Sequence, residues 1–136
     1  MRRNVPSKTK EKVINRDSAR CEYCKMSKED SFLPFEIDHI VSIKHGGGNE
    51  FENLAYSCLQ CNKHKGSDLT TFVDLYDNIV LLFNPRKHIW ENHFYAEDGI
   101  IYPKTEIGKA TIKLLQLNNP EVIVYRAILQ DLDRYP

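Results

Sequence analysis

Two pairs of cysteines constrain this chain more than any other feature. The pairs are Cys21-Glu-Tyr-Cys24 and Cys58-Leu-Gln-Cys61, and they contain all 4 cysteines of the 136-residue sequence. Four thiolates in two such pairs can hold one tetrahedral Zn²⁺ through sulfur–metal bonds of about 2.3 Å. Because four protein ligands leave no open coordination position, we expect this zinc to be structural. Four unrelated buried or redox-active thiols are the alternative, and they leave the matched spacing unexplained.

The composition excludes a disordered chain and a membrane-spanning one. Hydrophobic residues make up 41% of the sequence and charged residues 28%, a balance typical of globular proteins. The longest apolar run, residues 79–83, is far shorter than the roughly 20 residues that cross a bilayer. The first residues, MRRNVPSKTKEK, contain no apolar stretch of the kind found in signal peptides. We therefore expect no membrane partner and a reducing, cytoplasmic compartment, where disulfides are rare.

The charge is balanced overall and uneven locally. The 19 basic and 19 acidic residues give a net charge of zero, which excludes a uniformly basic nucleic-acid binder. Residues 1–20 are nevertheless strongly basic, with Glu11 and Asp17 as their only acids. Such a segment either binds phosphates or is a solvated tail, and the sequence leaves both interpretations open. Its basic residues are Arg2, Arg3, Lys8, Lys10, Lys12, Arg16 and Arg20.

The segment between the cysteine pairs predicts a strand, a loop and a second strand. Residues 35–41 (FEIDHIV) are β-prone, and residues 44–49 (KHGGGN) are a glycine-rich connection. Residues 53–56 (NLAY) can return as the partner strand. Residues 59–65 contain no helix breaker and are followed by Gly66, so we expect a helix that ends there.

Asp38 and His39 are the first candidates for chemistry. A carboxylate can bind a hard cation, and an imidazole can act as a general base. Adjacent residues of a strand face opposite sides, so the two can share a site only at the end of the strand. Asn62 in the following helix offers a neutral oxygen ligand. Oxygen ligands from Asp38 and Asn62 favour Mg²⁺ or Mn²⁺ over a soft metal, although Ni²⁺, Co²⁺ or Zn²⁺ could occupy the same site. Lys65 shares the helix face of Asn62, whereas His64 points elsewhere. Lys65 and His64 are candidate phosphate contacts, and simple solvent exposure is the alternative for each.

The combined pattern of these residues resembles the HNH endonucleases of the zinc-stabilised, ββα-metal type. The resemblance covers about residues 20–68 and implies a role for each matching position. Asp38 would bind a divalent metal, His39 would activate the attacking water, and Asn53 would orient the loop. Asn62 would be the second metal ligand, at a position where the family accepts either Asn or His. The matching residues are Cys21-x-x-Cys24, Ile37-Asp38-His39-Ile40, Gly46-Gly47, Asn53-Leu54 and Cys58-x-x-Cys61-Asn62-x-x-Lys65-Gly66.

The resemblance implies an α+β fold: a small ββα-metal HNH core with a Cys₄ zinc knuckle, followed by a C-terminal hairpin and a two-helix extension. We expect a basic N-terminal arm or helix over residues 1–19, the nuclease core over 20–68, and an extension packed on the core over 69–136.

Local patterns predict the elements of the second half. We expect a helix over residues 70–76, a strand over 88–95 with a hairpin turn at 97–99, and helices over 105–117 and 120–135. The FNPR…W..HF…DG pattern of this half also resembles the extension of many small bacterial HNH proteins, which implies architecture and no chemical role.

Two functions from different classes follow from these observations. The first is a DNA endonuclease with a structural Zn²⁺ and a catalytic Mg²⁺ or Mn²⁺. The second is a non-catalytic, zinc-stabilised nucleic-acid-binding module, which accounts for the cysteines and the basic arm but not for Asp38, His39 and Asn62 together. The oligomeric state has no signal in the sequence. We also expect Glu22 and Tyr23 to be exposed, and substitution of Asp38 or His39 to leave folding nearly unchanged.

Overall fold

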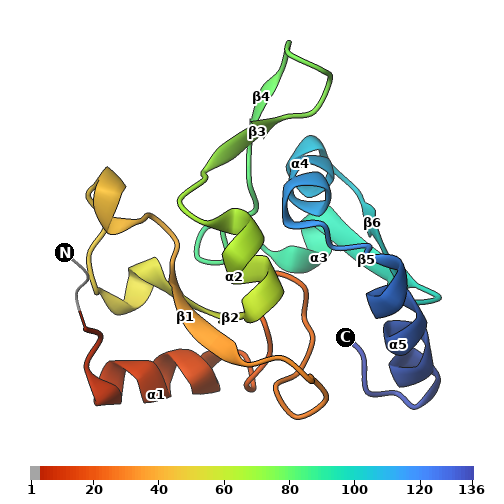
Figure 1. Cartoon of the computed structure of the whole chain (residues 1–136), viewed down its shortest axis with the longest axis horizontal. Helices are drawn as coiled ribbons and strands as arrows, with labels where there is room; N and C mark the ends of the chain where they lie inside the picture. Colours follow the sequence, from red (N-terminus) through yellow and green to blue (C-terminus); the bar gives the residue numbers. More distant parts are fainter. Residues whose placement is uncertain (1–3) are drawn as a thin grey trace. The chain divides into compact units, whose positions relative to one another are not determined.

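The computed structural model describes residues 4–136, which divide into two compact units (Figure 1). The first unit ends at Ser67, and the second spans Asp68–Pro136. Helices and antiparallel strand pairs occur together, so the predicted α+β class is confirmed. Arg2 and Arg3 of the basic arm lie outside the described residues. Within residues 4–136, no helix is both long enough and apolar enough to cross a membrane.

The first unit contains the predicted order of strand, loop, strand and helix. Strand β1 (Phe35–His39) pairs antiparallel with β2 (Leu54–Cys58), and α2 (Leu59–Lys65) follows directly. The helix ends before Gly66, whose φ of +51° lies in the left-handed region that favours glycine. The connection between the strands contains two short 3₁₀ helices, η1 (Ile43–His45) and η2 (Phe51–Asn53).

The N-terminal helix α1 (Ser7–Arg16) is an integral part of this unit. Its buried Val13 belongs to one apolar cluster with Leu54 and Tyr56 of β2. The Arg16 guanidinium also donates a hydrogen bond to the backbone oxygen of Leu54. The interpretation as a solvated tail therefore does not apply to residues 7–16. The exposed basic residues of this helix are Lys8, Lys10 and Lys12.

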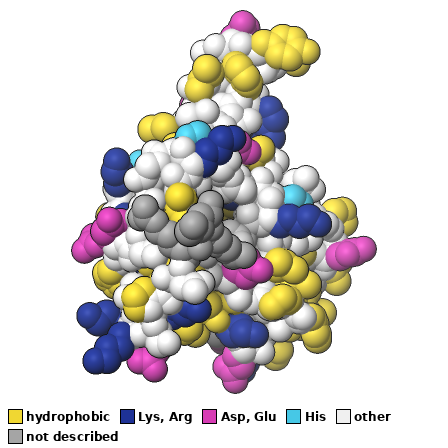
Figure 2. Space-filling model, turned by 60° about the vertical axis from the view of Figure 1, so that its left-hand side comes forward, with side chains coloured by type: hydrophobic (Ala, Val, Ile, Leu, Met, Phe, Trp, Pro, Cys, Tyr) yellow, Lys and Arg dark blue, Asp and Glu magenta, His cyan; other side chains and the backbone are white. Residues whose placement is uncertain are grey.

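The second unit begins with a hairpin where we expected a helix. Strand β3 (Thr70–Phe72) pairs antiparallel with β4 (Ile79–Leu81). The β-branched residues of both segments favour an extended backbone over a helix. The chain between the segments turns back, so the two extended segments pair. Hydrophobic side chains gather over this hairpin at the top of Figure 2. Those that are exposed are Phe72, Leu75, Tyr76, Ile79 and Leu81.

The remainder of the second unit contains a second hairpin and two helices, as predicted. The expected strand over residues 88–95 is wrong in its middle, where Trp90–His93 form a helical turn, α3. Trp90 and Phe94 are four residues apart, and the turn brings their buried rings into a tilted contact with centroids 5.0 Å apart. The other elements are β5 (Phe94–Glu97), β6 (Ile100–Pro103), α4 (Glu106–Leu115) and α5 (Pro120–Asp131).

Candidate functional site

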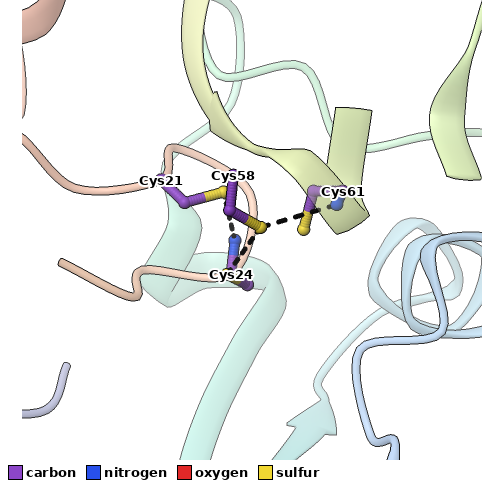
Figure 3. Close-up of side chains that lie close together, drawn as sticks. All are labelled: Cys21, Cys24, Cys58 and Cys61. Carbon is purple, nitrogen blue, oxygen red and sulfur yellow. Dashed lines mark hydrogen bonds between the residues drawn. The ribbon is translucent and has the colours of Figure 1, made fainter. Parts of the chain in front are cut away.

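The four cysteines converge where the turn of the first pair meets the start of α2 (Figure 3). Their sulfur atoms all lie within 4.8 Å of one another, and all four residues are buried. The sulfurs of Cys24 and Cys58 are 3.9 Å apart, close to the roughly 3.8 Å that tetrahedral bonds of 2.3 Å require. The cluster therefore has the donors and the size to bind one zinc ion, as the sequence predicted.

Hydrogen bonds within the cluster favour a thiolate. The backbone amides of Cys24 and Cys61 each donate to the first sulfur of their own pair, over 3.5 Å. Burial raises the pKa of Cys21, but hydrogen bonds from the other three sulfurs outweigh burial and hold this pKa well below its usual value. Hydrogen bonding to Cys21 raises the pKa values of Cys24 and Cys61. Zinc binding would therefore release protons from the remaining thiols.

The two middle residues of the first cysteine pair point inward, so the expectation that they are exposed is wrong. Glu22 is 4% exposed and Tyr23 is 1% exposed. The Glu22 carboxylate accepts a hydrogen bond of 2.9 Å from the backbone amide of Tyr56. The Tyr23 hydroxyl donates to Asp38 over 2.6 Å. The turn that carries Cys21 and Cys24 thus also holds both strands of the hairpin.

Asp38 lies in a buried polar cluster. It is 4% exposed, and the ammonium nitrogen of Lys65 lies 3.2 Å from one of its carboxylate oxygens. The same ammonium donates to the backbone oxygens of His39 and Ile40. Burial raises the pKa of Asp38, although the Lys65 charge and the Tyr23 hydrogen bond act in the opposite direction. Burial of the Tyr23 side chain likewise raises its pKa. The hydroxyl therefore keeps its proton and donates it to Asp38 in the hydrogen bond.

The position of Lys65 corrects its expected role. The sequence makes Lys65 a candidate for a phosphate contact or a plain surface lysine, but the residue is 2% exposed. An ammonium has three donors, and those of Lys65 are directed at Asp38 and two backbone oxygens. Lys65 therefore compensates the buried carboxylate. The other candidate, His64, is half-buried on α2, and its contact with phosphate stays a prediction.

Glu36 is a site residue that the sequence reasoning missed. Its carboxylate accepts a hydrogen bond of 2.5 Å from the side-chain amide of Asn62. Glu36 and Asp38 are two residues apart on β1 and therefore share the face that meets α2. The sequence signal that could have identified Glu36 is its spacing of two positions from Asp38, which places both carboxylates on one face of a strand. Glu36, Asp38 and Asn62 together supply the oxygen donors that hard divalent cations prefer.

His39 ends β1 and leaves the strand on the other face. Its ring nitrogen Nε2 lies 2.8 Å from the side-chain oxygen of Asn49, in the glycine-rich connection. Among residues 4–136, no hydrogen bond joins this ring to Asp38. The structure thus brings Asp38 and Lys65 together and pairs Asn62 with Glu36 of the same strand. His39 lies at the end of that strand.

Asn53 holds the loop between these elements. Its side-chain oxygen accepts from the backbone amide of Val41, and its amide nitrogen donates to the backbone oxygens of Val41 and Gly48, each at 2.9 Å. The loop passes so close to itself that a β-carbon on Gly47 would lie 1.7 Å from the Val41 oxygen. Only glycine fits there, and the Asn53 side chain joins the two ends of the loop.

Comparisons with known proteins give a family match for one segment and a distant relative for most of the chain. Residues 21–68 match the family described as HNH endonuclease. The chain is also 25% identical over 138 residues to the Septu protein PtuA of Bacillus mycoides (strain KBAB4). That alignment covers 81% of this chain and 19% of the relative. No solved structure matches the chain.

Proposed function

Residues 21–68 belong to the HNH endonuclease family, and from this premise we propose that the chain hydrolyses phosphodiester bonds of DNA with the help of a divalent cation. The observation that supports this function best is that His39 ends β1, the same strand whose Glu36 and Asp38 meet α2. Hydrolysis of a phosphodiester needs a base for the attacking water and positive charge near the phosphate.

His39 is the proposed general base. It is half-buried, so its ring is anchored in the protein and still reachable by water. An imidazole suits this role because its two nitrogens can act separately, one as a hydrogen-bond donor and the other as a proton acceptor. The unprotonated ring nitrogen of His39 would accept one proton from the water molecule that attacks phosphorus.

Asp38 and Asn62 are the proposed ligands of a catalytic Mg²⁺ or Mn²⁺. A carboxylate has about four acceptor positions, so Asp38 can accept from Tyr23 and Lys65 and still face a cation. Glu36 holds the Asn62 amide nitrogen, which leaves the amide oxygen as the atom available to the ion. When bound, the ion stabilises negative charge on the phosphate and on the leaving oxygen.

The DNA would contact exposed basic side chains of the first unit. Lys8, Lys10 and Lys12 are exposed on α1, and lysine contacts with the phosphate backbone position DNA without reading its sequence. His64 is a further candidate for such a contact.

One observation favours the non-catalytic alternative. The Asp38 carboxylate already has Lys65 and Tyr23 as partners, in surroundings that are almost fully buried. A carboxylate with these contacts can be purely structural. In that case the first unit would bind DNA without cleaving it.

Incubation of supercoiled plasmid DNA with the zinc-loaded protein separates the two functions. We expect relaxed or linear DNA after addition of Mg²⁺ or Mn²⁺, and intact plasmid without either ion. Because EDTA also removes zinc, the metal-free control is protein of verified zinc content in buffer that lacks other divalent ions. Binding of the plasmid without cleavage in either cation would establish the alternative.

A further inference from the structure

The hydrogen bond between His39 and Asn49 determines more than the place of the ring. Asn49 follows the three glycines of the connection between β1 and β2. Its side-chain oxygen lies 2.8 Å from His39 Nε2, and its amide nitrogen donates to the backbone oxygen of Asn4 over 3.1 Å.

The second of these contacts fixes the orientation of the Asn49 side chain. A backbone carbonyl only accepts hydrogen bonds, so the group that faces Asn4 has to be the NH₂ of the amide. The carbonyl oxygen of the amide therefore faces His39. Because this oxygen also only accepts, His39 Nε2 has to carry a proton.

We propose that Asn49 is a positioning residue that holds the proton of His39 on Nε2 and so makes Nδ1 the atom that accepts a proton from water. This inference rests on the proposed nuclease function for its catalytic part. In a neutral imidazole with a proton on Nε2, the lone pair is on Nδ1. Among residues 4–136, His39 Nδ1 makes no hydrogen bond, so this lone pair is available.

The loop around Asn49 is built to keep its amide in place. The backbone oxygen of Gly48, the residue before Asn49, accepts a hydrogen bond of 2.9 Å from the side-chain amide of Asn53. The backbone oxygen of Asn53 in turn accepts a hydrogen bond from the amide of Ile40, the residue after His39. Asn53 thus links the backbone beside Asn49 to the backbone beside His39, and the contact with Asn4 holds the amide from the other side.

Two substitutions distinguish control of the His39 proton from a purely structural role of Asn49, in which its hydrogen bond to Asn4 only anchors the loop. Asn49→Asp keeps an oxygen that can accept from His39 Nε2 but loses the donor to Asn4. Asn49→Ala loses both contacts. If the tie to Asn4 were the purpose of the residue, the two variants would behave alike.

The first readout is the nitrogen NMR spectrum of the His39 ring, in zinc-loaded protein without Mg²⁺ and at a pH where the ring is neutral. We expect wild type and Asn49→Asp to show a hydrogen-bonded Nε2 proton that exchanges slowly with water. In Asn49→Ala this proton should exchange too fast to be observed. A wild-type ring protonated on Nδ1 would overturn the proposal.

The second readout is the rate of DNA cleavage at saturating cation. Loss of a contact that orients a functional group typically costs about 10–100-fold, so Asn49→Ala should lower kcat by that factor with little change in KM. Asn49→Asp should recover most of the loss, and Asn92→Ala, at an exposed position of α3, should match wild type. Equal kcat values for Asn49→Ala and wild type, or for Asn49→Ala and Asn49→Asp, would contradict the assignment.

The two readouts also separate this inference from the function on which it rests. A wild-type protein that cleaves no DNA in any cation overturns the proposed function and the catalytic role of Asn49 with it. The NMR spectrum still decides in that case whether Asn49 fixes the proton on Nε2.

Discussion

The two units of this chain are stabilised by different means. The first unit buries four cysteines and a set of charged residues, including Glu22, Asp38 and Lys65, beside a small apolar cluster around Val13. The second unit buries mostly large apolar side chains, and its interior residues include Phe83, Trp90, Phe94, Ile101, Leu115 and Leu129.

The difference follows from what each unit contains. The candidate site requires carboxylates, amides and an imidazole around one short hairpin, and such groups leave little room for an apolar core. Small domains with a limited core depend on metals or other cross-links. We therefore infer that zinc does in the first unit what apolar packing does in the second.

Removal of one zinc ligand should have the largest effect and should be confined to the first unit. Structural zinc contributes on the order of 10 kcal/mol to folding of such sites, so Cys58→Ser should unfold the first unit. Hydrogen exchange measured by mass spectrometry should show lost protection in β2 and α2, and retained protection in α4 and α5. Equal protection of β2 in the variant and in wild type, with one zinc ion still bound, would refute the structural role of zinc.

Asp38→Ala should destabilise the first unit, contrary to the expectation from the sequence. The substitution removes the carboxylate that the buried Lys65 ammonium and Tyr23 hydroxyl contact. Breaking a buried ion pair costs about 3–5 kcal/mol, which urea unfolding can measure. The double variant Asp38→Ala, Lys65→Met removes the unpaired charge and should regain a large part of the loss. If the double variant is as unstable as the sum of the two single variants, the pair is not coupled.

The sequence predicted those parts of the molecule that depend on local patterns. The matched spacing of the cysteine pairs indicated the sulfur cluster, and residues 35–66 follow the expected strand, loop, strand and helix. The burial of Tyr23 was not predictable, because its partner Asp38 lies fifteen positions away in sequence and nothing near Tyr23 signals the contact. The β3–β4 hairpin was missed because a short segment with β-branched residues can form a helix or a strand, and pairing with residues 79–81 decides.

The role of Lys65 was missed for a related reason. Its spacing from Asn62 correctly placed both on one face of α2, but spacing does not reveal whether that face meets solvent or a strand. In the structure this face of α2 packs against β1, where Asp38 is buried. Lys65 is therefore buried as well and pairs with the Asp38 carboxylate.

Salt dependence of DNA binding tests a smaller difference between the units. Each phosphate contact adds about 0.9 to the slope of log affinity against log salt. Replacement of Lys8, Lys10 and Lys12 by Gln should therefore lower the slope by about 2 to 3 if all three contact phosphate. These residues are exposed on α1, so the helix itself should be retained. The matched control is Lys87→Gln with Lys109→Gln in the second unit, which should leave the slope unchanged. A slope that the α1 variant does not change would remove α1 from the DNA contact.

The smallest expected effect is a response of the second unit to acid. Burial, followed by the charges of His93 and Lys87, lowers the pKa of His88 below its ordinary 6.5. The unfolded chain therefore takes up a proton at a higher pH than the folded unit does. The stability that neutral His88 provides is complete above about pH 6.5 and is lost as the pH falls through the folded pKa. Urea unfolding of the second unit at neutral and mildly acidic pH should show this loss, and His88→Gln should reduce it. An unchanged pH dependence in the variant would assign the response to another group.

The function of the first unit depends most directly on His39. His39→Ala removes the proposed base but leaves the zinc ligands and the buried cluster around Asp38 intact. General-base catalysis contributes about 10²–10⁴-fold, so the single-turnover rate of plasmid cleavage at saturating Mg²⁺ or Mn²⁺ should fall by that factor. Zinc content, thermal midpoint and the cation concentration for half-maximal rate should match wild type. Cleavage by His39→Ala at the wild-type rate in the same cation would contradict the proposed mechanism.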